Sequence, residues 1–144
     1  MRHRVYGDKL GRNKDQRDVL FKSLVQSLFT HGSIKTSETK AKAIKGLVDK
    51  IINLAKSKTA RRLLQSYLVN QSLRERLIKE ILPKMETKVS GYTSVIRLGR
   101  RMGDDTMMVK MSLIGAEELK SIEKKESRIH GSSSKNQASR EKTK

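Results

Sequence analysis

Two adjacent aspartates are the first residues of this chain to consider for chemistry. Asp104 and Asp105 follow Gly103 at a predicted hairpin turn, and paired carboxylates on a tight turn can hold magnesium for reactions of phosphate esters. Such a site needs further carboxylates from another strand, whereas the other acids are scattered over predicted helices and the end of the chain. Gly and Asp are also the residues that hairpin turns prefer. We therefore interpret this motif as a turn, with a metal-dependent nuclease as the alternative.

The three histidines do not form a catalytic or metal-binding set. His3, His31 and His130 are far apart, and none has a carboxylate at a meaningful spacing. The chain has no cysteine, which excludes disulfides, thiolate zinc sites and cysteine nucleophiles. No nucleophile elbow surrounds a serine, and no glycine-rich phosphate loop is present. We predict a protein that is not an enzyme and that uses no cofactor, metal or small-molecule substrate.

Lysine and arginine dominate the remaining chemistry. The chain has 33 Lys plus Arg against 15 Asp plus Glu, a formal net charge of +18. Such a surplus repels itself, so the folded protein is expected to lie beside a polyanion. No apolar run approaches the roughly 20 residues that cross a bilayer, and the start lacks the apolar stretch of a signal peptide. We expect a cytoplasmic protein with a nucleic-acid partner and no membrane.

Apolar residues that recur at spacings of three and four predict two long helices. Asp15 is placed to cap the first, and Gly32 suits the left-handed conformation that ends a helix. Ser33 to Thr36 then predicts an extended segment, and Thr36 or Ser37 starts the second helix. Opposite the apolar face of that helix lies a row of lysines: Lys40, Lys42, Lys45 and Lys50.

Two shorter helical segments follow. The first is predicted from about Ala60 to Leu68 by its leucines. Ser72 and Glu75 then have the spacing of a capping box, in which each side chain accepts a hydrogen bond from a free amide. This last helix is expected to stop near Pro83.

From Ser90 the apolar period changes from helical to alternating, which predicts strands. Residues 92–98 and 107–113 alternate in matching fashion, and RRMGDD turns the chain between them. We predict a β-hairpin with a long tip that is basic and then acidic. Its methionines are more typical of core packing than of a partner surface: Met102, Met107, Met108 and Met111.

These elements predict an α+β fold in which helices pack on one face of a small mixed sheet that contains the C-terminal β-hairpin. Residues 1–14 are interpreted as a basic RNA-binding arm and residues 15–115 as the α+β domain. Residues 116–144 are polar and serine-rich, and are expected to form a flexible tail.

The basic arm has the side chains that fit folded RNA. Arg2, Arg4 and Arg12 can each give two hydrogen bonds to phosphate oxygens, and Tyr6 or His3 can stack on an unpaired base. Without a recognition helix, an irregular arm suits single-stranded and loop features of RNA better than duplex DNA.

Several ordered motifs resemble one known family. They are MRHR with Gly7, Leu10 and Arg12-Asn13; Ile34-Lys35-Thr36 before Lys40-Ala41-Lys42; Gly91-Tyr92-Thr93; and Arg101-x-Gly103-Asp104. Across residues 1–114 their order and spacing are similar to those of the seventeenth protein of the bacterial-type large ribosomal subunit. Val5-Tyr6 departs from that pattern, and the tail after Gly115 extends past the usual end of the family.

The resemblance implies a structural protein that binds large-subunit rRNA near the exit side of the peptide tunnel and contacts neighbouring ribosomal proteins. The family's RNA-contacting positions also include Leu10. Combined with the basic residues of the arm and hairpin, the predicted RNA-binding set is Arg2, His3, Arg4, Lys9, Arg12, Asn13, Lys14, Lys35, Thr36, Lys40, Lys42, Tyr92, Thr93, Arg97, Arg100 and Arg101. A free-standing nucleoid or RNA-chaperone protein is the alternative that the same charge allows.

Overall fold

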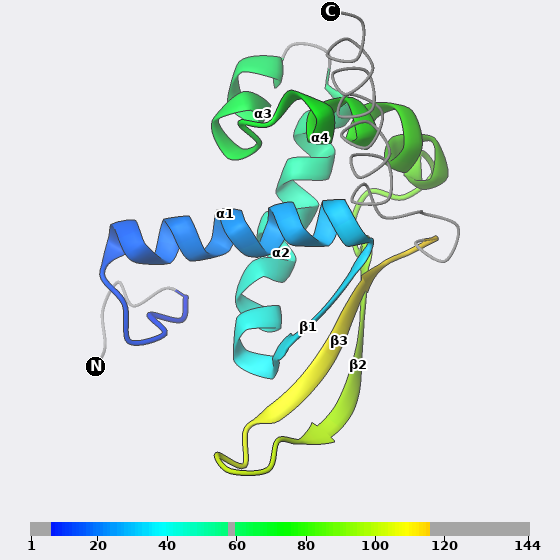
Figure 1. Ribbon diagram of the computed structural model, residues 1–144. Coiled ribbons are helices and arrows are strands. Elements are labelled where there is room, and N and C mark those ends of the chain that lie inside the picture. Colours follow the sequence, from blue (N-terminus) through cyan, green and yellow to red (C-terminus); the bar gives the residue numbers. More distant parts are fainter. Residues whose placement is uncertain (1–6, 58–59, 116–144) are drawn as a thin grey trace, which may run out of the picture.

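The computed structural model describes residues 7–57 and 60–115 (Figure 1). The predicted tail and the contacts expected of Arg2, His3 and Arg4 lie outside the described residues. The α+β class is confirmed. The elements are, in chain order, α1 (Lys14–His31), β1 (Ser33–Ser37), α2 (Glu38–Lys56), α3 (Arg61–Tyr67), α4 (Gln71–Arg76), a π-helical turn (Leu77–Ile81), a 3₁₀ turn (Leu82–Met85), β2 (Thr93–Arg100) and β3 (Met107–Leu113).

The sheet has three strands in the order β1-β3-β2, so the last strand of the chain lies at its centre. Both pairings are antiparallel, which corrects the expectation of a mixed sheet. The tight hairpin makes β2 and β3 antiparallel, and β1 joins the free edge of β3 with the hydrogen bond from Leu113 N to Gly32 O, 3.0 Å, at the end of the pairing. A register shift between Arg97 and Gly99 interrupts the β2 ladder near the hairpin tip.

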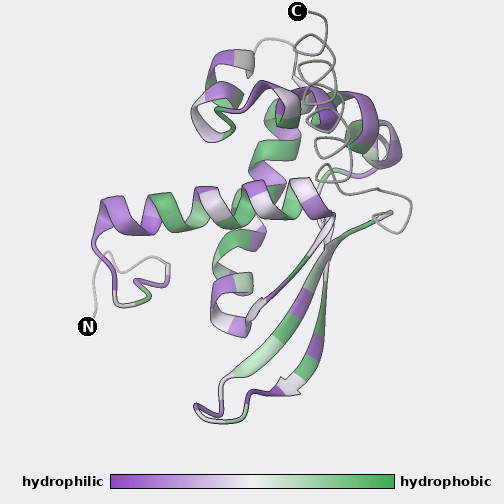
Figure 2. Ribbon diagram, in the orientation of Figure 1, coloured by the Kyte–Doolittle hydropathy of each residue, from purple (hydrophilic) through white to green (hydrophobic). Residues whose placement is uncertain are grey.

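Helix α2 covers one face of the sheet, and α1 crosses α2 (Figure 1). The core is aliphatic apart from Phe29 and Tyr92, which are both fully buried. Buried and more exposed residues alternate along β3 from Val109, as predicted, whereas β2 is exposed at every residue after Thr93 (Figure 2). Alternate residues of β3 point into the core: Val109, Met111 and Leu113. Of the methionines, Met111 is buried whereas Met102 is 100% exposed at the hairpin tip, so the core interpretation holds for only part of the set.

The ends of α1 follow local rules, although the predicted cap was wrong. Asn13, not Asp15, is the N-cap, and its backbone N–H donates to Gln16 Oε1 at 3.4 Å. Gly32 ends the helix with φ 75° and donates to Leu28 O at 2.8 Å, as predicted. Asp15 lies in the first turn, where an acid favours the helix dipole without capping.

The N-cap of α4 also lies two residues earlier than predicted. Asn70 is the N-cap, and its Oδ1 accepts from Ser72 N at 3.0 Å, so the predicted Ser72–Glu75 capping box is wrong. Glu75 instead accepts from Gln71 and Lys79. The helical path then loosens into the π-helical turn and ends in the 3₁₀ turn that holds Pro83, close to the predicted stop.

A cluster of polar contacts ties the start of β2 to α2. Asp49 accepts the backbone N–H groups of Gly91 and Tyr92 at 3.3 and 3.2 Å. The Tyr92 hydroxyl lies 2.6 Å from Asn53 Oδ1 and 2.8 Å from Lys88 O. Lys56 Nζ lies 5.0 Å from the centre of the Tyr92 ring and also donates to backbone carbonyls of the segment before β2. These contacts hold β2 against α2.

Candidate nucleic-acid interface

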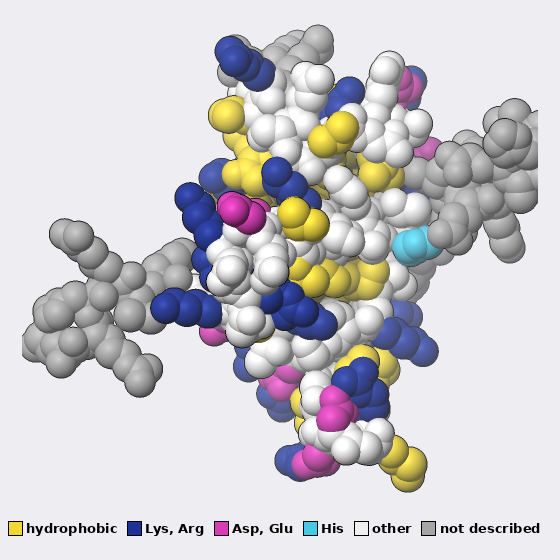
Figure 3. Space-filling model, turned by 60° about the vertical axis from the view of Figure 1, so that its left-hand side comes forward, with side chains coloured by type: hydrophobic (Ala, Val, Ile, Leu, Met, Phe, Trp, Pro, Cys, Tyr) yellow, Lys and Arg dark blue, Asp and Glu magenta, His cyan; other side chains and the backbone are white. Residues whose placement is uncertain are grey.

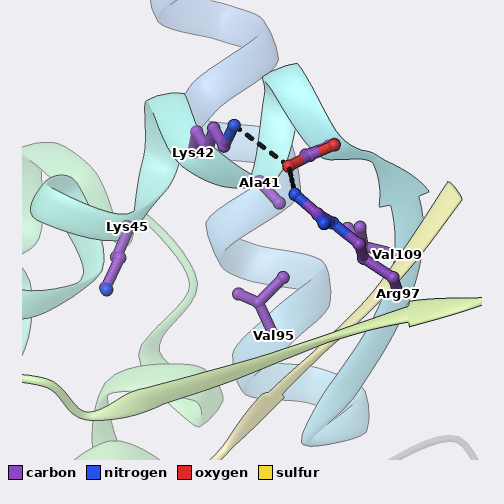
Figure 4. A pocket seen from close by; sticks show the side chains of 7 residues that line it. Ala41, Lys42, Lys45, Val95, Arg97 and Val109 are labelled. Atoms are coloured by element: carbon purple, nitrogen blue, oxygen red, sulfur yellow. Dashed lines mark hydrogen bonds and ion pairs between the residues drawn. The ribbon is translucent and has the colours of Figure 1, made fainter. Parts of the chain in front are cut away.

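A groove of about 380 Å³ lies between the first turns of α2 and strand β2 (Figure 4). Its floor is apolar and consists of Ala41, Val95 and Val109. Its rim is charged and consists of Glu38, Lys42, Lys45 and Arg97. An apolar floor under a cationic rim can receive the face of a sugar or base while phosphate oxygens contact the rim.

Glu38 organises the cations of this rim. Its Oε1 accepts from Arg97 Nη2 at 2.9 Å and from Lys42 Nζ at 3.0 Å (Figure 4). The hydrogen bond from Arg97, followed by that from Lys42, lowers the pKa of Glu38 below its usual range. The side chains of Lys42 and Arg97 remain 68% and 69% exposed, and Lys45 has no acidic partner among the described residues. The rim therefore presents cations in fixed positions and keeps a positive balance.

The predicted hairpin tip carries internally paired charges. Arg100 pairs with Asp105, and Arg101 Nε donates to Asp104 Oδ1 at 3.0 Å. Asp104 also accepts from the Thr106 hydroxyl at 2.9 Å, and these bonds, the one from Arg101 first, lower its pKa well below the usual range. Asp104 in turn raises the pKa of Arg101. The two aspartates act as turn and ion-pair residues, and the described residues contain no cluster of three metal-ligating side chains.

Three of the predicted RNA-binding residues have buried side chains. Tyr92 is 0% exposed, while Thr36 and Thr93 are 7% and 8% exposed. Thr36 faces α2 from β1, beside Val109, and the Tyr92 hydroxyl is bonded within the fold. These three side chains contribute to the packing of the fold, and RNA contact at their positions stays a prediction.

The described part of the arm is exposed and basic. Lys9, Arg12 and Lys14 are open to solvent, and Arg12 Nη1 donates to Leu10 O at 2.9 Å. Leu10 and Gly11 both have positive φ, 51° and 62°, and they turn the chain into α1. Asn13 lies here as the cap of α1, which gives it a structural role as well.

Basic residues gather on several elements rather than at one point. Figure 3 shows Lys and Arg side chains spread over one face of the molecule, with acidic ones beside them at the hairpin tip. Among the predicted residues, the groove unites Lys42 and Arg97, whereas Lys35 lies on β1 and Lys40 is half-buried. The exposed lysines outside the predicted set include Lys45 of the groove and Lys110 of β3. The helical period already places Lys45 in the row of lysines on the second helix, and the alternating period of β3 places Lys110 on the face opposite its buried residues.

The described residues form a small, strongly basic α+β domain with charged surfaces, which is a class of protein suited to binding a polyanion. In its described part, no helix is long and apolar enough to cross a membrane. The sequence profile of the family described as Ribosomal protein L17 matches residues 20–114, more than half of the chain. The chain belongs to this family, which makes it a structural protein of the ribosome and not an enzyme.

Individual relatives agree with this assignment. The chain is 39% identical over 116 residues to the large ribosomal subunit protein bL17 of Rubrobacter xylanophilus, covering 79% of this chain and 96% of the relative. It is 40% identical over 112 residues to that of Carboxydothermus hydrogenoformans, covering 76% and 100%. For Persephonella marina bL17 the identity is 42% over 118 residues, covering 79% and 95%.

Proposed function

We propose that this protein is a structural constituent of the cytoplasmic large ribosomal subunit, where it serves translation by binding large-subunit rRNA and stabilising the assembled particle near the exit side of the tunnel. The names of its relatives support a place in the large ribosomal subunit. The net charge of +18 supports a polyanionic partner. Neighbouring ribosomal proteins are its other proposed partners. The proposal includes no membrane and no small-molecule substrate.

The groove between α2 and β2 is the observation that best supports the proposed rRNA binding. Lys42 and Arg97 are held by one carboxylate at 3.0 and 2.9 Å, so their positions are set before RNA arrives. Less side-chain freedom is then lost on binding, and the guanidinium plane can give two hydrogen bonds to one phosphate. Lys45 adds a cation without a described acidic partner.

The arm and the hairpin extend this interface. Lys9, Arg12 and Lys14 lead into α1, and we propose that they continue onto RNA together with Arg2, His3 and Arg4. Lys40 adds positive charge on α2, and Lys35 adds positive charge on β1, on the side of the sheet opposite the groove. Arg100 and Arg101 stay exposed beside their aspartates and would make weaker contacts, because binding RNA there brings phosphate close to a carboxylate.

Sedimentation of cell lysate tests the ribosomal part of the proposal. The chain should remain with the large subunit after a high-salt wash, because a protein built into the particle is held at several surfaces at once, although each phosphate contact weakens with salt. Recovery mainly on DNA and away from ribosomes would refute the proposal and favour a nucleoid protein.

Binding of purified protein to large-subunit rRNA tests the groove. Replacing Lys42, Lys45 and Arg97 with Gln should reduce the slope of log affinity against log salt by about 2, from about 0.7 per phosphate contact. A matched variant loses three exposed cations elsewhere: Lys22→Gln, Lys79→Gln and Lys88→Gln. Equal losses in both variants would show that total charge, and not the groove, determines binding.

A further inference from the structure

The sheet has a second face that no described helix covers (Figure 1). In the antiparallel register, paired residues lie on the same side of the sheet. The side opposite α2 therefore includes two neighbouring rows that cross all three strands. One row is Ser33, Ser112 and Ser94, and the next is Lys35, Lys110 and Ile96. We call these six residues the open face.

The open face is cationic without a compensating acid. Lys35 and Lys110 are direct cross-strand partners, and both are exposed. Neither side chain has an ion pair or hydrogen bond with another described residue. The three strands contain no Asp or Glu. Like charges placed opposite each other destabilise a sheet, so an anionic partner would relieve a repulsion that the free protein retains.

The row of serines leaves room for a phosphate group beside the two lysines. Short hydroxyl side chains keep the surface low beside the two ammonium groups, and neighbouring strands are only about 4.8 Å apart. A phosphate group above this part of the sheet can therefore accept from hydroxyls and from both lysines. Serine hydroxyls and paired ammonium groups are the donors that sugar–phosphate backbones accept from without any reading of base sequence.

We propose that the open face is a second rRNA surface, which binds the phosphate backbone through Lys35, Lys110 and the serine row. It rests on the proposed rRNA binding but is separate from the groove, because the two lie on opposite sides of the sheet. The protein would then be held between two stretches of RNA, with α2 and the groove toward one and the open face toward the other. An acidic segment of a protein neighbour is the competing occupant.

The salt dependence of rRNA binding tests the charge. The double variant Lys35→Gln, Lys110→Gln should lower the log–log slope by about 1.4, twice about 0.7. The control Lys22→Gln, Lys79→Gln removes equal charge from exposed positions on other elements. An unchanged slope in the double variant, or an equal loss in the control, would overturn the proposal.

Tethered cleavage tests the location, and the lack of native cysteine makes single labels possible. An iron chelate that generates hydroxyl radicals is attached at Ser94→Cys on the open face or at Lys45→Cys in the groove, within assembled large subunits. The proposal expects rRNA cleavage from both labels, at different nucleotides. Cleavage from the groove alone would refute the open face and leave the proposed function intact. Absence of rRNA cleavage from both labels would refute the proposed function. Cleavage of a neighbouring protein, without rRNA cleavage, from the label at Ser94→Cys would establish the competing occupant.

Discussion

Replacing Tyr92 with Phe should destabilise the fold without weakening RNA binding. The phenyl ring keeps the buried position and the approach of Lys56 Nζ, 5.0 Å from the ring centre. Only the hydroxyl is lost, along with its contacts to Asn53 Oδ1 at 2.6 Å and to Lys88 O at 2.8 Å. One buried hydrogen bond contributes about 1 kcal/mol to the free energy of unfolding. For a domain of about 100 residues, this loss lowers Tm by about 4–8 °C.

Thermal and urea unfolding, followed by circular dichroism, measure this change. Tyr67→Phe is a matched control, because Tyr67 is half-buried and its hydroxyl has no hydrogen bond with a described residue. The control should change the free energy of unfolding by less than about 0.5 kcal/mol. Both variants should bind rRNA as the wild type does at temperatures well below Tm.

Two results would refute this reasoning. Equal stability of Tyr92→Phe and the wild type would show that the hydroxyl contacts contribute nothing to the link between β2 and α2. A specific loss of RNA affinity at unchanged stability would show that Tyr92 reaches RNA after all, as its place in the family motif implied.

Three other substitutions test separate parts of the structure. Gly32→Ala should lower the free energy of unfolding by about 1–2 kcal/mol in urea titrations, because φ is 75° at this position and a Cβ is strained there. Lys110→Glu should raise the stability of the free protein by about 0.2–1 kcal/mol, since it replaces a like-charge pair with Lys35 by an attractive one, while weakening rRNA binding. Glu38→Gln should make the free energy of unfolding less dependent on pH in acid. The folded state lowers the pKa of Glu38 from 4.5. The stabilisation that ionised Glu38 gives is therefore present above about pH 4.5 and is lost as pH falls through the folded pKa. The same pH dependence of stability in this variant and the wild type, from neutral pH down through pH 4.5, would contradict the pairing of Glu38 with Arg97.

Local patterns predict most of the fold because they have local causes. Gly32 marks a helix end since a left-handed residue is needed there, and the alternation of β3 follows from one buried face. Caps are harder to predict, since Asn13 and Asp15 are both good capping residues and only the path of the arm into α1 decides between them. The same ambiguity separates Asn70 from Ser72.

The candidate interface is less predictable, because it depends on contacts between distant residues. Arg97 and Glu38 are 59 residues apart, and the sequence around each residue does not predict that they form an ion pair. Tyr92 shows a second difficulty, because its place in the family motif implies RNA contact and gives no sign that its side chain is buried. The contacts of Asp49, Asn53 and Lys88 show that it is a buried anchor.

The central position of β3 has a consequence for how the domain is made. Strand β1 ends at Ser37, whereas its partner β3 begins only at Met107. During synthesis, some 70 further residues must therefore be added before β1 can pair. At about 5–20 residues per second, this delay is several seconds, during which α1 and α2 can meet but the sheet cannot form. A nascent chain arrested before Met107 should therefore show helical structure without a protected sheet.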